Sequence, residues 1–218
     1  MFIGHIAVGF ASKALAPRTS LVVLIAAPVF ADLIWPIFLS LGWEHVRIDP
    51  GNTAFTPLGF VDYPISHSLI TSVGWGLLVG AVYCAVTRYT RGAVVAALGV
   101  VSHWVLDFVT HGPDMPLYPG GPRVGLGLWD SVAGTIAVES VMWGFGLWIY
   151  LRQTRALDRT GTYAFWFFVA LLLLIYGLNA QGQPPPSVGA LIITAYAGWM
   201  IPMWAWWIDR HRKVREAG

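Results

Sequence analysis

Six stretches of the chain are apolar over roughly the 20 residues that a helix needs to cross a bilayer. They are residues 20–41, 66–87, 92–111, 128–151, 163–180 and 187–208. A shorter apolar stretch at 2–16 ends before Pro17, and it predicts a helix that crosses most of the bilayer or re-enters it. The pattern therefore predicts an all-α protein, a polytopic transmembrane helical bundle of about six full spans with a short N-terminal membrane helix.

Composition agrees with a membrane protein and excludes several other classes. Of the 218 residues, 56% are hydrophobic and 11% are charged, against roughly 25% charged in an average soluble domain. A net charge of +2 is too small to indicate a nucleic-acid partner. The one cysteine, Cys84, excludes both a disulfide framework and a cysteine-based metal motif. We expect a single membrane domain over 1–218 with membrane lipids as its partners.

Positive charges alternate between successive loops. One set of loops and ends carries Lys13, Arg18, Arg88, Arg91, Arg152, Arg155, Arg159, Arg210, Arg212, Lys213 and Arg215. The intervening loops, 42–65, 112–127 and 181–186, hold only Arg47 and Arg123. By the positive-inside rule the first set is cytoplasmic, which makes 209–218 a basic cytoplasmic tail and places Met1 outside. The first apolar stretch is not expected to be a cleaved signal peptide, because its positive charges follow it.

Under this topology the ionisable residues of the membrane segments gather near the outer leaflet. They are His5, Asp32, His67, His103, Asp107, His111 and Asp130, with Glu139 a little deeper. Ionisable residues inside a membrane are costly and usually face the bundle interior, where they are paired or functional. The sequence thus predicts an outward-facing site on the helices of 1–151, with 163–208 as a scaffold helix pair.

The strongest local pattern is the pair of His103 and Asp107. Four residues apart on one helix face, the two side chains can chelate a single ion. Together with His5, Asp32 and His67 they supply three imidazoles and two carboxylates, a donor set that suits zinc, manganese or iron. Such a set can hold one ion, or two that share a bridging carboxylate. For a lone His5 or His67, the alternative is a hydrogen bond to the backbone or to a lipid headgroup.

Three further residues are candidates for catalytic groups. His111 would lie about 12 Å beyond His103 on a continued helix, too far to share an ion with it. We expect it to bind substrate or transfer protons at the mouth of the site, or to be an interfacial residue. Glu139 and Asp130 are candidate proton acceptors, although Glu139 could instead orient a ligand histidine or make an interhelical hydrogen bond. Asp114 follows Pro113 and is expected to cap or turn the chain.

The segments GHIAVG, FADLIWP, ISHSL and SHWVLDFVTHGPDMPLYPGG resemble the YdjM-like family of predicted bacterial membrane-bound metal-dependent hydrolases over roughly residues 1–130. The resemblance implies a bacterial inner-membrane location and the metal ligands His5, Asp32, His67, His103 and Asp107. Because that family is distantly similar to helical zinc-dependent phospholipase C proteins, it also implies a phosphoester or lipid-type substrate. The chain departs from the family at Ile34, where a second acid could stand, and at YPIS, 63–66, where Arg-Gly-Phe-Thr is usual.

The leading hypothesis is a membrane-embedded hydrolase whose divalent ion, zinc in the first instance, activates water at the outer leaflet. One alternative is a transporter or permease that uses the same residues to bind metal or protons. Another is a non-catalytic scaffold in which a closed metal site ties the helices together. The substrate, the number of ions and the oligomeric state stay open at this point.

Overall fold

The computed structural model describes residues 1–180 and 183–215, so the predicted loop 181–186 and the predicted tail 209–218 are described only in part. Its helices are α1 Ile3–Leu15, α2 Leu21–Ala26, α3 Phe30–Ser40, α4 Pro64–His67, α5 Leu69–Thr87, α6 Thr90–Thr110, α7 Val132–Gln153, α8 Arg159–Asn179, α9 Val188–Tyr196 and α10 Met200–His211. Two 3₁₀ turns, η1 Leu128–Asp130 and η2 Ala197–Trp199, precede α7 and α10. The architecture is essentially all-α, as the hydropathy pattern predicts.

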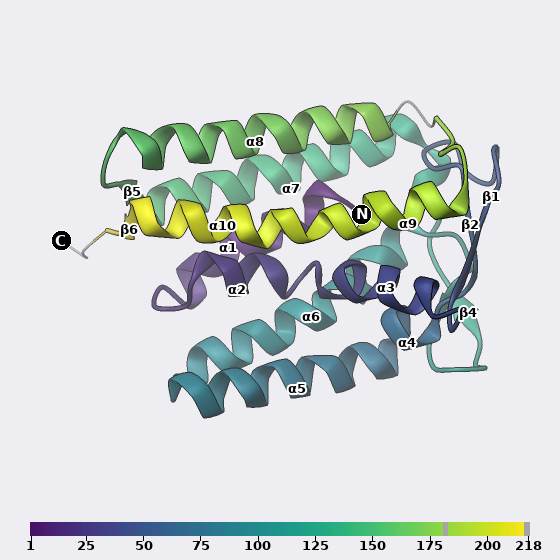
Figure 1. The fold of residues 1–218 in the computed structure, drawn as a ribbon, viewed down its shortest axis with the longest axis horizontal. Coiled ribbons are helices and arrows are strands. Elements are labelled where there is room, and N and C mark those ends of the chain that lie inside the picture. Colours follow the sequence, from purple (N-terminus) through teal and green to yellow (C-terminus); the bar gives the residue numbers. More distant parts are fainter. Residues whose placement is uncertain (181–182, 216–218) are drawn as a thin grey trace.

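Short antiparallel hairpins close the two ends of the bundle. β1 His45–Ile48 pairs with β2 Leu58–Asp62, and β3 Met115–Pro116 pairs with β4 Arg123–Val124. Both lie at one end, which we call the hairpin end (Figure 1). β5 Thr154–Ala156 pairs with β6 Arg212–Val214 at the opposite end, which we call the tail end. Part of the predicted basic tail is therefore a strand.

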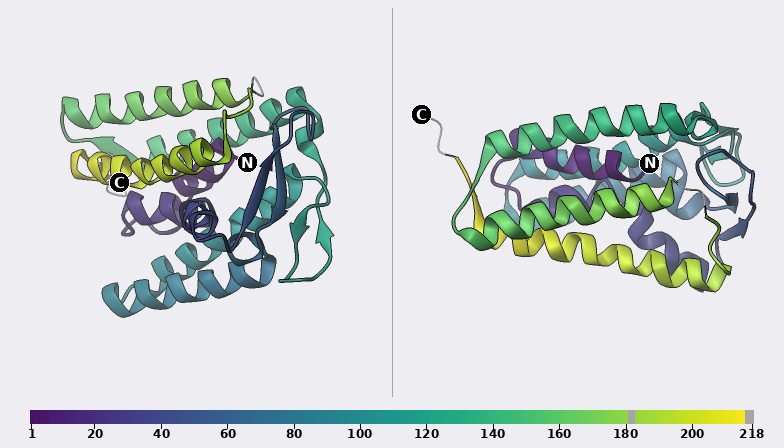
Figure 2. Two further views of the ribbon diagram at one scale, coloured as in Figure 1. Left: turned by 45° about the vertical axis from the view of Figure 1, so that its right-hand side comes forward. Right: turned by 90° about the horizontal axis from the view of Figure 1, so that it is seen from above.

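The short helix α1 is at the centre of the bundle. It packs against α7, α2 and α6, while α5 and α6 form a close pair on one side and α8 packs on α10 on the other. Figure 2 shows the same arrangement from two further directions. The core around α1 contains fully buried aromatic side chains, including Phe10, Tyr150, Phe165 and Phe168. A helix surrounded in this way is expected to be apolar on all sides, and α1 is so except at His5, Ser12 and Lys13.

Within the described residues, five helices are long and apolar enough to cross a membrane. They are α5, α6, α7, α8 and the continuous segment Val188–His211, which joins α9, η2 and α10. Their exposed apolar side chains match a lipid environment, and we treat the protein as a membrane protein.

The predicted span over 20–41 is divided into α2 and α3, which lie one after the other along the long axis of the molecule (Figure 1). The division falls at Pro28, between Ala26 and Phe30. Proline lacks an amide hydrogen, and its ring clashes with the carbonyl of the preceding helical turn. The backbone carbonyls at this break are consequently free to accept hydrogen bonds from elsewhere.

Hydroxyl and carboxylate side chains cap the starts of the long helices. Ser68, Ser131, Asp158 and Ser187 accept hydrogen bonds from the backbone amides of the first turns of α5, α7, α8 and α9. Each such cap typically contributes about 0.5–2 kcal/mol. These residues explain why the helices begin several positions later or earlier than hydropathy alone predicts.

A clasp holds the tail end together. The Arg212 guanidinium donates to Thr154 Oγ1 at 3.1 Å and to the Gly161 carbonyl at 3.2 Å. It also lies 4.8 Å from the ring centroid of Phe165. Nearer the bundle centre, the Trp204 indole donates to the Ala164 carbonyl at 3.0 Å. Helices α8 and α10 are thus fixed to each other at this end.

Close backbone approach around α1 depends on glycine. A Cβ atom added at Gly146 of α7 would lie 2.5 Å from the Ala7 carbonyl oxygen, and one added at Gly9 would lie 2.6 Å from the Leu24 carbonyl oxygen. Both distances are well below van der Waals contact, and both partners are backbone atoms that cannot rotate away. Small residues at helix contacts are how membrane helices achieve tight packing.

We predict that Gly146→Ala lowers the stability of the purified protein by about 1–3 kcal/mol, because the added methyl separates α7 from α1. Gly144→Ala is the matched control on the same helix, since a Cβ there meets nothing within 4 Å among the described residues. Thermal unfolding in detergent distinguishes the two. Equal melting temperatures for both variants would show that the α1–α7 contact does not limit stability.

Candidate metal centre

The structure brings together the five residues that the sequence predicts as metal ligands. In two groups of side chains, the ligand atoms all lie within 4.8 Å of one another: His5, His103 and Asp107 form one group, and Asp32, His67 and His103 form the other. His103 belongs to both, so the residues form a single cluster drawn from α1, α3, α4 and α6. Imidazole and carboxylate groups at this separation could hold a metal ion.

Asp107 joins the cluster from α6. Its Oδ1 lies 3.0 Å from His5 Nε2, and its Oδ2 lies 3.0 Å from His103 Nε2. The Met1 amino group also contacts Oδ1. The carboxylate is almost completely buried. Its two oxygens thus lie against two histidines, one on α1 and one on α6 itself.

The orientation of His103 depends on the break between α2 and α3. Its Nδ1 lies 2.8 Å from the Pro28 carbonyl oxygen. A carbonyl can only accept, so Nδ1 carries the proton and Nε2 presents its lone pair to the cluster. The carbonyl that fixes this tautomer is one that an unbroken helix would have used internally.

A chain of hydrogen bonds orients His67 from the opposite side. The Ser66 hydroxyl donates to Glu44 Oε2 at 2.6 Å and lies 2.6 Å from His67 Nδ1. Since its one proton is used on the carboxylate, the hydroxyl accepts from Nδ1–H. Glu44 is itself buried and accepts from the amides of Ile65 and Ser66, both at 2.8 Å. His67 Nε2 is left facing Asp32 Oδ1 at 3.5 Å.

His5 is positioned through the start of α1. Glu139 on α7 accepts from the amides of Phe2 and Gly4, both at 2.9 Å, and so caps the helix that carries His5. The His5 ring stacks on His103 with a centroid separation of 4.0 Å. Glu139 is fully buried, and the contact is the interhelical hydrogen bond that was one of its predicted alternatives. Its role as a proton acceptor stays a prediction.

The arrangement of lone pairs fits a bound cation. His103 Nε2 makes no hydrogen bond within the described residues, although it is buried and only 3.0 Å from Asp107 Oδ2. A ring protonated only at Nδ1 sets its lone pair against a carboxylate oxygen, so Nε2 needs either a second proton or a cation between the two atoms. The same applies to His67 Nε2 and Asp32 Oδ1, which are 3.5 Å apart. A divalent cation bound by these imidazole and carboxylate groups would meet the requirement at both places, so the residues present fit a metal ion.

The two ligand groups share His103, and this limits how many metal ions they can hold. His103 offers Nε2 alone, because its Nδ1 is committed to the Pro28 carbonyl. The two groups therefore cannot each hold an ion with three ligands of their own.

His111 lies at the end of α6, four residues after Asp107, and its ring faces that residue. Helix α6 ends at Thr110, and His111 has an extended backbone with ψ 153°. Its Nε2 reaches to 3.8 Å from Asp107 Oδ2, and its Nδ1 lies 3.0 Å from Asp114 Oδ1. Asp114 was expected only to cap or turn the chain, whereas it orients this imidazole.

Tyr63 completes this side of the site. Its hydroxyl donates to Asp114 Oδ1 at 3.2 Å. Burial raises the pKa of the Tyr63 phenol, and the negative charge of Asp114 raises it further. The phenol therefore stays protonated and serves as a fixed donor beside His111.

The structure does not bring Asp130 into the cluster. Its side chain is exposed at the end of η1, and it makes no hydrogen bond or ion pair with the cluster in the part of the chain described here. Depth in the membrane was the basis for grouping it with the others, and depth does not determine which way a side chain points.

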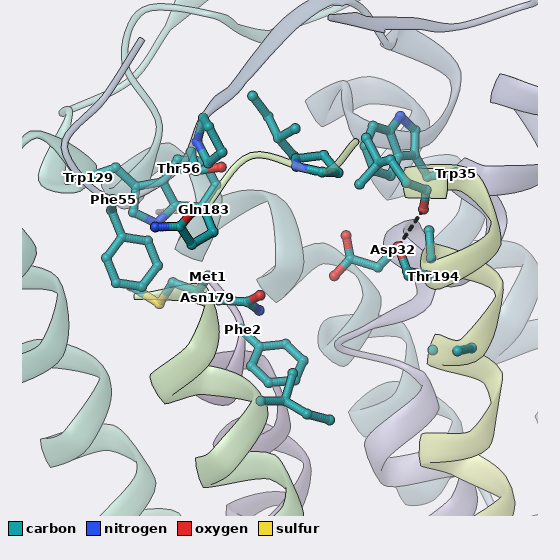
Figure 3. Close-up of a pocket in the computed structure, with 18 of the residues that line it drawn as sticks. Met1, Phe2, Asp32, Trp35, Phe55, Thr56, Trp129, Asn179, Gln183 and Thr194 are labelled. Carbon is teal, nitrogen blue, oxygen red and sulfur yellow. Dashed lines mark hydrogen bonds between the residues drawn. The ribbon is translucent and has the colours of Figure 1, made fainter. Parts of the chain in front are cut away.

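A pocket of about 500 Å³ adjoins the cluster at Asp32. Figure 3 shows the Asp32 carboxylate pointing toward its interior. This side chain is 46% exposed, whereas the side chains of the other four predicted ligands are at most 5% exposed. The wall is mainly apolar and includes Met1, Phe2, Leu33, Trp35, Phe55, Pro57, Leu58, Trp129, Ile175 and Leu191. The cluster is thus closed on most sides and open on one.

Sequence reasoning missed Glu44, Ser66 and the Pro28 carbonyl as supporting groups. The serine directly before His67 and the proline inside an apolar run were visible signals for two of them. No local sequence pattern identifies Glu44. It lies in the loop between α3 and β1, and it accepts hydrogen bonds from Ile65 and Ser66 at the start of α4.

Comparison of the chain with protein-family models, with curated proteins and with solved structures finds no match. The resemblance to the YdjM-like family therefore stays a hypothesis.

We predict that Ser66→Ala weakens zinc binding by about 10- to 100-fold, because the protonated Nδ1 of His67 loses its acceptor. Competition with a chromophoric chelator measures the affinity. Ser72→Ala is the control, since Ser72 is equally buried but its hydroxyl has no partner among the described residues. If both variants bound zinc as tightly as the parent, the Glu44–Ser66–His67 chain would have no part in metal binding.

Proposed function

We propose that this protein is an integral membrane metal-dependent hydrolase that acts on a phosphoester or lipid-type substrate. The observation that carries the proposal is the pair of oriented imidazoles, His67 and His103, whose Nε2 atoms face the carboxylates of Asp32 and Asp107, with Asp32 in the wall of a pocket. Zinc is the proposed ion, because the donors are imidazole and carboxylate; manganese and iron accept the same set.

Such an ion, when bound, polarises an ester oxygen and lowers the pKa of a water ligand toward neutrality. The protein's own contribution is to hold His5, His67, His103 and Asp107 in a dry setting with their orientations fixed. Asp32 extends the set into the pocket, where a substrate can approach. An open side of this kind distinguishes a catalytic site from a closed structural one.

His111 and Asp114 are proposed to transfer protons. The Nδ1–H of His111 is held by Asp114, and its Nε2 faces Asp107 across 3.8 Å. Asp114 is 25% exposed and so connects the buried imidazole to the surface. A histidine oriented by a carboxylate is a common general acid or base.

The hairpin end is proposed to face outward in a bacterial inner membrane. The tail end carries the arginines and lysines that the positive-inside rule assigns to the cytoplasm. The cluster then lies near the outer leaflet. The resemblance to YdjM-like hydrolases implies the bacterial inner-membrane location. A transporter is less favoured, because in the described part of the chain the His and Asp groups of the cluster gather toward one end, and the other buried ion pair, Lys13 with Asp209, is separate from them.

The first test is the metal content of the detergent-purified protein. We expect bound zinc in the parent and its loss in His103→Ala and in Asp107→Ala. His45→Ala is the control, because His45 is an exposed histidine on β1. A zinc-loaded parent should hydrolyse phospholipids or short-chain phosphodiesters, and the two metal-free variants should not. Unchanged metal content in both variants would exclude this site.

A further inference from the structure

The pocket beside Asp32 extends between two membrane helices, α8 and α9. One wall is the stripe Leu191, Thr194 and Ala195 of α9 with Gly198 of η2, whose spacing of three and four residues defines one helix face. Its wall on α8 is formed by Ile175 and Asn179, one turn apart. Figure 3 shows Asn179 on α8 and Thr194 on the opposite helix, with the pocket between them.

The pocket reaches the depth of lipid acyl chains. Gly198 lies ten residues after Val188, the first residue of α9 at the hairpin end, which corresponds to about 15 Å along the helix. Half of the hydrocarbon core of a bilayer is also about 15 Å thick. With the hairpin end at the bilayer surface, as proposed above, the inner end of the pocket at Gly198 would lie at the depth of the lipid acyl chains.

Helices α8 and α9 diverge at the hairpin end. Helix α9 packs against α3 and β1, whereas α8 is packed by α10 further toward the tail end. No residue of α9 is buried. At the hairpin end, α9 is therefore held by α3 and β1 on one side and, among the described residues, is not packed closely against α8 on the side of the pocket.

From the hairpin end the pocket is covered by the loop between β1 and β2. The Phe55 amide donates to the Trp129 carbonyl at 3.0 Å, and the two rings stack. Figure 3 shows Phe55, Thr56 and Trp129 on the hairpin side of the pocket, beyond Met1 and Asn179. A water-soluble substrate would have to pass this aromatic cover.

We propose that the substrate is a long-chain membrane lipid that reaches the site sideways, with one acyl chain between α8 and α9 and its ester group at Asp32. The proposal rests on the proposed function for the chemistry at Asp32. The apolar stripes match a hydrocarbon chain. The polar groups near the hairpin end, Asp32, Thr56 and Gln183, lie where the ester and headgroup would be.

The test uses the full chain in lipid nanodiscs that contain a phosphatidylcholine with a diazirine in the middle of one acyl chain. Photolabelled residues are assigned by fragmentation mass spectrometry. We expect label on the pocket faces of α8 and α9 in excess of label at Ile193, which is 72% exposed on another face of α9. Label spread evenly around α9 would overturn the proposal.

Matched tryptophan substitutions make the test specific. Ala195→Trp fills the pocket and should lower its label several-fold, while Ile193→Trp, on the same helix, should leave the label unchanged. Metal content serves as the check on folding. If Ala195→Trp loses metal, Gly198→Leu replaces it, because a side chain at Gly198 first meets Leu33 only at 3.9 Å. Undiminished pocket label in the folded variant would exclude this route.

The same experiment separates this proposal from the proposed function. In His103→Ala the pocket is intact, so pocket label should persist without metal. Pocket label in a parent that binds no metal would support the acyl-chain site and exclude the metal-dependent hydrolase. Bound metal without pocket label would support the metal site and exclude the acyl-chain site.

Discussion

A buried carboxylate in a membrane protein must be compensated by positive charge, and Asp107 imposes this requirement on the whole bundle. In a low-dielectric interior an isolated charge is very costly. The Met1 amino group supplies one positive charge at Asp107 Oδ1, and the His5 and His103 rings lie 3.0 Å from its two oxygens. A cation bound among these groups would compensate the remaining negative charge of the cluster. The packing of α1, α3 and α4 against α6 and the assembly of the cluster therefore depend on each other.

Irregular backbone supplies the groups that a regular helix cannot. The division at Pro28 exposes a carbonyl to His103, the short helix α4 places Ser66 between Glu44 and His67, and the chain after α6 brings Asp114 to His111. Non-helical backbone at membrane depth is tolerated only where it is buried in protein or lines a cavity. Here each irregularity lies against the candidate site, where its free polar groups have partners.

Much of this arrangement could be predicted from sequence, for identifiable reasons. Long apolar runs define α5 to α8 because the bilayer sets their length, and the four-residue spacing of His103 and Asp107 defines one helix face. The convergence of His5, Asp32 and His67 on that face followed from depth and charge alternation. The same reasoning failed for Asp130, because depth carries no information on side-chain direction. It did not anticipate the 3.0 Å contact of Asp114 with His111, and it could not find Glu44, whose contacts depend on a loop.

The clasp at the tail end also sets how the protein can move. Pairing of β5 with β6, the Arg212 contacts and the Trp204–Ala164 hydrogen bond hold α8 and α10 at one end only. If the gap between α8 and α9 widens, the two helices rotate relative to each other about their contacts at the tail end. The 3₁₀ turn η2 lies between α9 and α10, and a short 3₁₀ segment inside a long helix often marks a hinge. Helix α9 would bend relative to α10 at this turn. Displacement is largest at the hairpin end, so a small angular change there would be enough to admit or release a chain.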